Sequence, residues 1–143
     1  MIMINIDLTS SLDKICDKMK DHIKEKAINT VEEATKLLYD EVKNECPVDT
    51  GALKNSITYD IEEGNNKANG IITAGEPYCF YVCYGTGIYA ENGKGRNTPW
   101  TYQDSNGNWH YTFGQQPNNF FRRAFINKEE ELKNILKNYK WLI

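Results

Sequence analysis

The sequence predicts a single α+β domain over residues 1–143, with a long N-terminal helix and a C-terminal helix packed on a small, mainly antiparallel sheet with an extended aromatic hairpin. Three observations predict this class. Apolar residues recur every three or four positions in one long segment near each end of the chain. Between these segments, shorter runs alternate apolar and polar residues and are bounded by Gly, Asn and Pro. No internal repeat or linker marks a second domain.

The first segment predicts a helix that is long for a domain of this size. A short strand is expected just before it, where Ile2, Ile4 and Ile6 alternate with other residues. About 34 helical residues make a rod about 50 Å long, whereas a compact domain of this length is about 37 Å across. Part of the apolar stripe is therefore expected to pack against another subunit, unless the helix kinks near Asn29. The stripe comprises Leu12, Ile15, Met19, Ile23, Ala27, Val31, Ala34, Leu38 and Val42.

The junction after this helix is the most specific local pattern. Pro47 cannot continue a helix, because it lacks an N–H group and its ring clashes with the preceding turn. Asp49 and Thr50 are predicted to cap the short turn at residues 51–55 through their side-chain oxygens. A strand is expected next, at residues 57–61, where apolar and polar residues alternate.

The rest of the chain is expected to form short elements followed by a helix. Residues 62–70 read as a hairpin loop before a returning strand at 71–74, and residues 78–84 as a short buried helix before a long loop. Two aromatic runs, 98–102 and 109–113, flank an Asn-Gly turn and predict a second hairpin. A last helix begins near Pro117, and its predicted apolar side comprises Phe120, Phe121, Ala124, Phe125, Leu132, Ile135, Leu136 and Tyr139.

Composition narrows the function classes. The net charge of −3 argues against a dedicated nucleic-acid binder, which needs a basic face. No run of 18 apolar residues predicts a membrane span. No Cys-x-x-Cys pair occurs and the two histidines stand apart from the cysteines in the sequence, so we expect reduced thiols in a core and neither metal nor cofactor. The cysteines are Cys16, Cys46, Cys79 and Cys83.

Particular residues support two functional hypotheses, an aspartic protease and a ligand-binding hairpin. Asp49, Thr50, Gly51 and Ala52 match the catalytic tetrapeptide of retropepsin-like aspartic proteases, in which two subunits share a carboxylate pair. Those enzymes need apolar strands before the loop, whereas here a long helix and Pro47 precede it.

A ligand-binding hairpin is the second alternative, in which aromatic faces stack on a sugar or choline. Its rings would be Trp100, Tyr102, Trp109 and Tyr111, which also suit cross-strand packing or a protein interface.

Four patterns, in order, resemble the gene-product-ten-like tail-completion family of tailed bacteriophages, also called minor tail, neck or head–tail joining proteins. They are the Pro-Val-Asp-Thr-Gly-Ala-Leu segment that starts at Pro47, the tyrosine-bounded segment 78–84 followed by Gly-Thr, the hairpin that ends at Gly114, and Pro117 followed by two phenylalanines. The resemblance covers roughly residues 8–140. The motif residues it marks are Pro47, Asp49, Thr50, Gly51, Leu53, Gly85, Thr86, Gly114, Pro117 and Phe120.

The resemblance implies a non-enzymatic structural subunit of a phage or tail-like particle, made in the cytoplasm of the bacterial host. Such a subunit would form a ring, expected to be hexameric, that completes the tail tube and joins it to the neck or collar. Its partners would be copies of itself, the tail tube protein and neck or connector proteins, with DNA passing through the lumen without specific binding. The residues expected at its interfaces are Ile15, Met19, Trp100, Tyr102, Trp109 and Tyr111.

Overall fold

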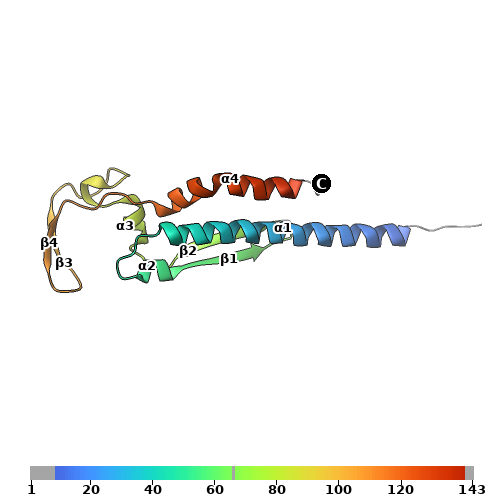
Figure 1. The fold of residues 1–143 in the computed structure, drawn as a ribbon, viewed down its shortest axis with the longest axis horizontal. Coiled ribbons are helices and arrows are strands. Elements are labelled where there is room, and N and C mark those ends of the chain that lie inside the picture. The colour runs from blue at the N-terminus through green and yellow to red at the C-terminus, as the bar shows by residue number, and fades with distance from the viewer. Residues whose placement is uncertain (1–8, 66, 141–143) are drawn as a thin grey trace, which may run out of the picture.

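The computed structural model describes residues 9–65 and 67–140, and the side chains of residues 13–65 and 67–138. The helix α1 (Thr9–Glu45) lies at the centre, with α4 (Phe120–Lys140) along one side of it and β1 (Ile57–Glu63) and β2 (Ala68–Ala74) along the other (Figure 1). The predicted α+β class is confirmed. Both helices were expected on the sheet, but the main neighbour of α4 is α1, since α1 presents apolar side chains to both layers. The strand predicted at residues 2–6 lies outside the described residues.

The helix α1 is continuous, so the alternative of a kink at Asn29 is wrong. Thr30 adjoins that position and donates its hydroxyl proton to the Lys26 carbonyl oxygen at 2.8 Å within the same helix. The 37 residues of α1 make a rod about 55 Å long. Its N-terminal part extends beyond both the sheet and α4 (Figure 1). We call residues 13–26, in which every side chain is exposed, the overhang. The overhang agrees with the length argument made from the sequence.

The core lies at the other end of α1, where its last turns meet α2 (Ala52–Ser56), α3 (Cys79–Tyr84) and the first turns of α4. The sheet approaches α1 closely at Gly70, because a Cβ atom there would overlap the hydroxyl oxygen of Thr35. Thr35 is itself buried and donates its hydroxyl proton to the Val31 carbonyl oxygen at 2.6 Å. The buried core cluster comprises Val42, Cys46, Leu53, Ile57, Cys83, Phe120 and Ala124.

The first hairpin pairs β1 with β2 in antiparallel register from Ile57 opposite Ala74 to Glu63 opposite Ala68. The returning strand begins three residues earlier than expected, so the loop between the strands is shorter. Tyr59 on β1 packs against Tyr39 on α1 with ring centroids 4.9 Å apart. The second hairpin pairs β3 (Trp100–Gln103) with β4 (Trp109–Thr112), at the end of the molecule opposite the overhang (Figure 1).

Two predictions of burial are wrong. The helix α3 was expected to be buried, yet Phe80 and Tyr81 are 58% and 57% exposed and only Cys83 is buried within it. A helix of six residues turns one side to the core and leaves its other side uncovered. On α4, Phe125 and Leu136 were assigned to the apolar side but are exposed, because one neighbouring helix covers only a narrow stripe.

Candidate functional site

The junction after α1 folds around a left-handed glycine. Gly51 has a φ angle of 85° and is the N-cap of α2, where the structure shows no side-chain cap bond. The cap predicted for Asp49 is therefore wrong: α2 begins one residue after Gly51, which leaves that carboxylate exposed and too early in the chain. Thr50 remains nearby, and its hydroxyl oxygen accepts the Ala52 N–H at 3.4 Å. Leu53 then enters the core, so the motif serves to turn the chain from α1 into the sheet.

The setting of Asp49 differs from that of a retropepsin-like protease. The half-buried Pro47 and a 37-residue helix precede the Asp-Thr-Gly loop. Each of the two sheets in the described part of the chain has two strands, so the loop does not belong to a barrel. The structural context that the protease interpretation requires is thus not found among these residues.

A second junction joins the Gly-Thr motif to the base of the aromatic hairpin. The Thr86 N–H donates to the Gln115 carbonyl oxygen at 2.9 Å, and the Gln115 N–H donates back to the Thr86 hydroxyl oxygen at 2.9 Å. The two segments are so close that a Cβ atom on Gly87 would overlap the Phe113 carbonyl oxygen, and one on Gly114 would overlap that of Thr86. Gly87 and Gly114 also have φ angles of 61° and 129°. Glycine is therefore required here.

The same junction contacts the start of α4. A Cβ atom on Gly85 would lie 2.9 Å from Cδ of Pro117, and the Asn118 N–H donates to the Val82 carbonyl oxygen at 2.8 Å. Phe120 follows and is completely buried. The structure thus brings together Gly85, Thr86, Gly114, Pro117 and Phe120, which the sequence marked separately. Together they fix how the aromatic hairpin leaves the core.

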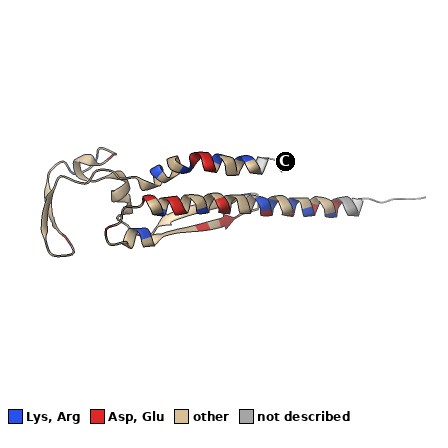
Figure 2. Cartoon of the chain, viewed as in Figure 1, with Lys and Arg blue, Asp and Glu red and all other residues tan. Residues whose placement is uncertain are grey.

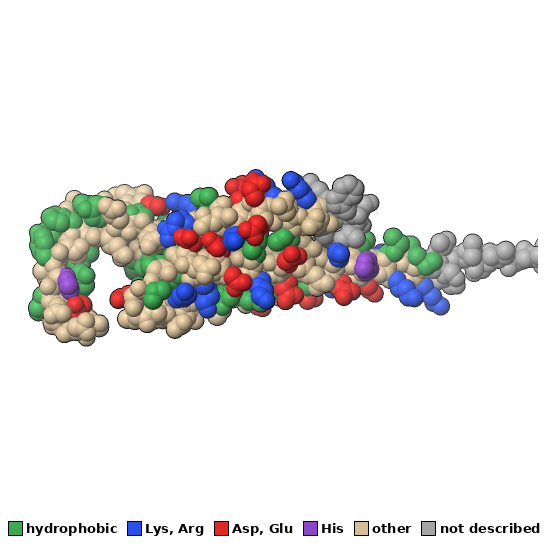
Figure 3. All heavy atoms as spheres, viewed as in Figure 1, with side chains coloured by type: hydrophobic (Ala, Val, Ile, Leu, Met, Phe, Trp, Pro, Cys, Tyr) green, Lys and Arg blue, Asp and Glu red, His purple; other side chains and the backbone are tan. Residues whose placement is uncertain are grey.

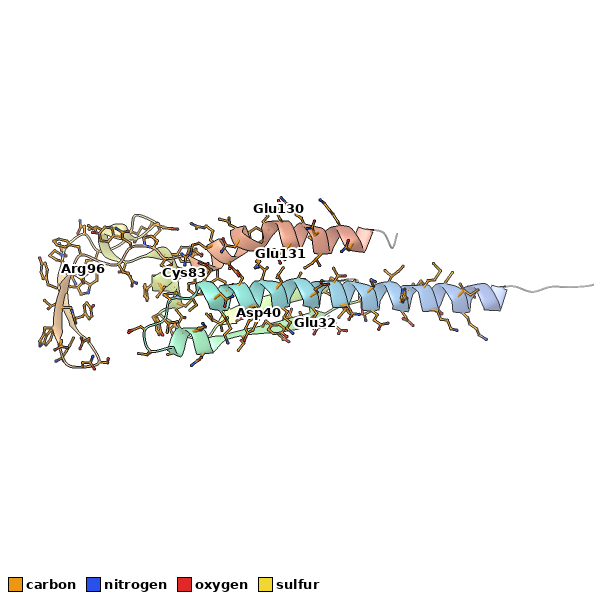
Figure 4. The ribbon with its side chains drawn as sticks, in the orientation of Figure 1. Glu32, Asp40, Cys83, Arg96, Glu130 and Glu131 are labelled. Carbon is orange, nitrogen blue, oxygen red and sulfur yellow. The ribbon has the colours of Figure 1, made fainter. Side chains whose placement is uncertain are left out.

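The aromatic hairpin is largely exposed. Trp109 and Tyr111 are 70% and 66% exposed, and Tyr102 is 48% exposed. Trp100 is half-buried beneath Arg96, whose guanidinium carbon lies 5.6 Å from the indole centroid. Figure 4 places Arg96 beside the hairpin. The structure brings these four predicted rings onto one element, distant from Ile15 and Met19 on the overhang.

The tip of the hairpin is ordered by one carboxylate. Asp104 accepts the backbone N–H groups of Asn106 and Asn108, each at 2.9 Å, and lies 2.8 Å from Nε2 of His110. The His110 hydrogen bond, followed by those from Asn108, lowers the pKa of Asp104 from 3.8 to about 2. The His110 ring also stacks on Tyr102, with centroids 5.2 Å apart. Sequence reasoning missed this pair, although an Asp before Asn-Gly is typical of such turns.

Three of the four thiols lie in or against the core, as expected, and Cys16 on the overhang does not. Burial, together with the nearby Cys79, raises the pKa of Cys83 to about 12. Figure 4 shows Cys83 on α3, close to the end of α1. In the described part of the chain, no group of three or more Cys, His, Asp or Glu side chains has the arrangement of a metal site.

Charged and uncharged surfaces are separated along the molecule. Lys, Arg, Asp and Glu residues lie along α1, α4 and β1, whereas α3, β3 and β4 contain none (Figure 2). Apolar side chains gather over the end of the molecule that carries these three elements (Figure 3). Within residues 9–65 and 67–140, no helix is both long and apolar enough to span a bilayer.

Comparison with known proteins gives one family. The chain matches the family model described as "Bacteriophage HK97-gp10, putative tail-component" over residues 10–93. No curated protein and no solved structure matches it. The matched region runs from α1 through the Gly-Thr motif and covers more than half of the chain, while the aromatic hairpin and α4 lie beyond it. The chain therefore belongs to the HK97 gp10-like family of bacteriophage tail components.

Proposed function

We propose that this tail component is a ring-forming subunit that completes the tail tube and joins it to the neck, with six copies expected in the ring. Membership of the family gives the structural role in a phage tail. The observation that supports the ring is the overhang of α1, the first turns of which extend past the sheet and past the described part of α4 (Figure 1).

The overhang exposes three large apolar side chains on one side of the helix. Ile15, Met19 and Ile23 are 53%, 58% and 40% exposed. They are spaced four residues apart, so they lie one above another over about 12 Å of helix. Burying a fully exposed side chain of this kind contributes roughly 1.5–3 kcal/mol, and about half of each of these three remains to be buried. A contact of that size between neighbours would stabilise an assembly because every interface repeats it.

The geometry of the overhang favours a closed ring. If the overhang of one subunit packs on a different surface of its neighbour, the contact is head-to-tail, and such contacts close into a ring when the rotation between subunits permits. Tail tube and connector proteins would then bind the two faces of this ring. The negative charge of the subunit suits a channel through which DNA passes without specific binding.

The test uses Ile15→Glu and Met19→Glu, with native mass spectrometry of the purified full chain and imaging of any rings. Both side chains are more than half exposed, so each variant is expected to keep the fold and melting temperature of the dissociated subunit. Both are expected to block ring formation, because a carboxylate would be buried at every interface. Six-fold rings of the unaltered protein would support the expected stoichiometry.

Lys24→Gln is the matched control. It changes the net charge by the same amount, in the same stretch of helix, at an exposed position on another side of α1. Rings are expected to form normally with this change. If rings formed equally well with Ile15→Glu or Met19→Glu, the overhang would not be an interface. If the unaltered protein stayed monomeric at the protein concentrations at which tails assemble, the ring itself would be refuted.

A further inference from the structure

We propose that the aromatic hairpin of one subunit docks on α3 of a neighbouring copy of this chain, through two uncharged aromatic surfaces. This inference rests on the proposed ring and names a second contact within it. The first surface, the hairpin stripe, comprises Trp109, Tyr111 and Phe113. The second surface, the α3 platform, comprises Phe80, Tyr81 and Tyr84.

The hairpin stripe lies on one face of the second sheet. Its residues alternate along β4 and just beyond it, so their side chains point to the same side. They are 70%, 66% and 45% exposed, and the rings of Tyr111 and Phe113 meet edge to face with centroids 5.6 Å apart. The principal partner of each of these strands is the other strand, so the face is uncovered in the isolated subunit. The glycine junction at its base holds the hairpin in a defined direction.

The α3 platform is a second exposed cluster, on a helix whose Cys79, Val82 and Cys83 pack in or against the core. Phe80, Tyr81 and Tyr84 are 58%, 57% and 40% exposed. The ring of Phe80 lies 4.8 Å from that of Tyr84 and 5.9 Å from that of Tyr81. Cys83, on an adjoining side of the same helix, is buried in the core. The platform is therefore an apolar surface that needs little ordering to bind a partner.

Because neither surface contains a charged side chain, the two surfaces match each other in character. Charged residues make up 26% of the chain, yet residues 77–90 contain none and residues 97–121 contain only Asp104. Glu91, Lys94 and Arg96 lie in the loop between these ranges, and Arg96 lies over Trp100, on the face of the hairpin opposite the stripe. A charge-bearing partner would bury its charges without counterparts, which is costly. A second copy of the chain offers a surface of matching character in every neighbouring position. The elements that carry both surfaces, α3 and the hairpin, also lie at the same end of the molecule (Figure 1), so subunits related by rotation present them at the same level.

The sizes of the surfaces agree with a partial interface. An aromatic side chain buries about 150–250 Å², so three partly exposed rings would bury on the order of 400 Å² on each side. A specific interface of standard size buries about 800 Å² per partner. The docked hairpin would thus supply about half of an interface, and the overhang would supply much of the rest.

The test uses two variants, Trp109→Glu and Phe80→Glu. Both side chains are more than half exposed, so each variant is expected to keep the fold. Thermal melting of the dissociated subunit checks this. Alone, each variant is expected to need at least about tenfold more protein to associate than the unaltered chain, as for loss of a central aromatic contact. Mixed together, the two are expected to form one-to-one pairs and nothing larger. One intact hairpin then meets one intact platform, while the opposite contact in the mixture carries both changes.

Native mass spectrometry of the single variants and of the mixture decides the outcome. Ile126→Glu is the control, because Ile126 is 60% exposed on α4, outside both surfaces, and is expected to associate like the unaltered chain. If either variant alone formed rings at the lowest concentration at which the unaltered chain forms them, or if the mixture formed no pairs, the docking would be overturned. The proposed ring would still stand in that case, provided that Ile15→Glu abolishes it. A monomeric unaltered protein would overturn both.

Discussion

Replacing Phe120 by alanine tests where the core of this subunit lies. Phe120 has no exposed surface and sits in the cluster with Cys83 and Ala124, with the ring of Phe121 4.8 Å away. Truncating a buried phenylalanine removes its transfer free energy and leaves a cavity, which together cost about 3–5 kcal/mol. Phe125 lies on the same helix but is 53% exposed. Its truncation is expected to cost about 1 kcal/mol or less.

The assay is thermal unfolding of both variants, monitored by circular dichroism at two protein concentrations so that subunit association is recognised. For a chain of about 150 residues, each kcal/mol lowers the melting temperature by roughly 2–4 °C. Phe120→Ala is thus expected to melt roughly 6–20 °C lower, and Phe125→Ala about 4 °C lower or less. Equal losses in the two variants, independent of concentration, would refute the assignment of the core to one side of α4.

Three further predictions concern other regions. Gly70→Ala is expected to destabilise the subunit by at least about 1 kcal/mol, because the new Cβ atom would overlap a buried hydroxyl of α1; an unchanged urea midpoint would contradict the close approach of β2. Asp104 is expected to titrate near pH 2 by carboxyl NMR, and nearer 3.8 in the His110→Ala variant. Because the pKa of Asp104 is lowered in the fold, its hydrogen bonds contribute fully to stability above about pH 4, and this contribution is lost as the pH falls toward 2. A pKa of Asp104 that the substitution leaves unchanged would contradict the pairing with His110. At pH 8, iodoacetamide is expected to alkylate the exposed Cys16 quickly and the buried Cys83 only after unfolding, as peptide mass spectrometry would show; equal rates would contradict the burial of Cys83.

The sequence by itself determined the order and type of most elements. The continuous apolar period of α1, the proline that follows it and the Asn-Gly turn of the hairpin are local signals, because each depends on the backbone preferences of residues close together in the chain. The length of α1 also follows from the sequence alone, and with it the expectation that part of the helix lies outside a compact domain. Both the overhang and the exposed aromatic hairpin were therefore foreseeable as candidate interfaces.

Only the tertiary structure decided which apolar side chains are buried. Phe120 and Phe125 fit the apolar period of α4 equally well, yet one is in the core and the other is exposed, because α1 covers α4 on one side alone. Likewise, Phe80 and Cys83 belong to one apolar run, and the neighbours of α3 select Cys83. Burial depends on contacts between segments far apart in the chain, and these contacts also set the glycine junction that directs the hairpin. Periodicity carries no information about them.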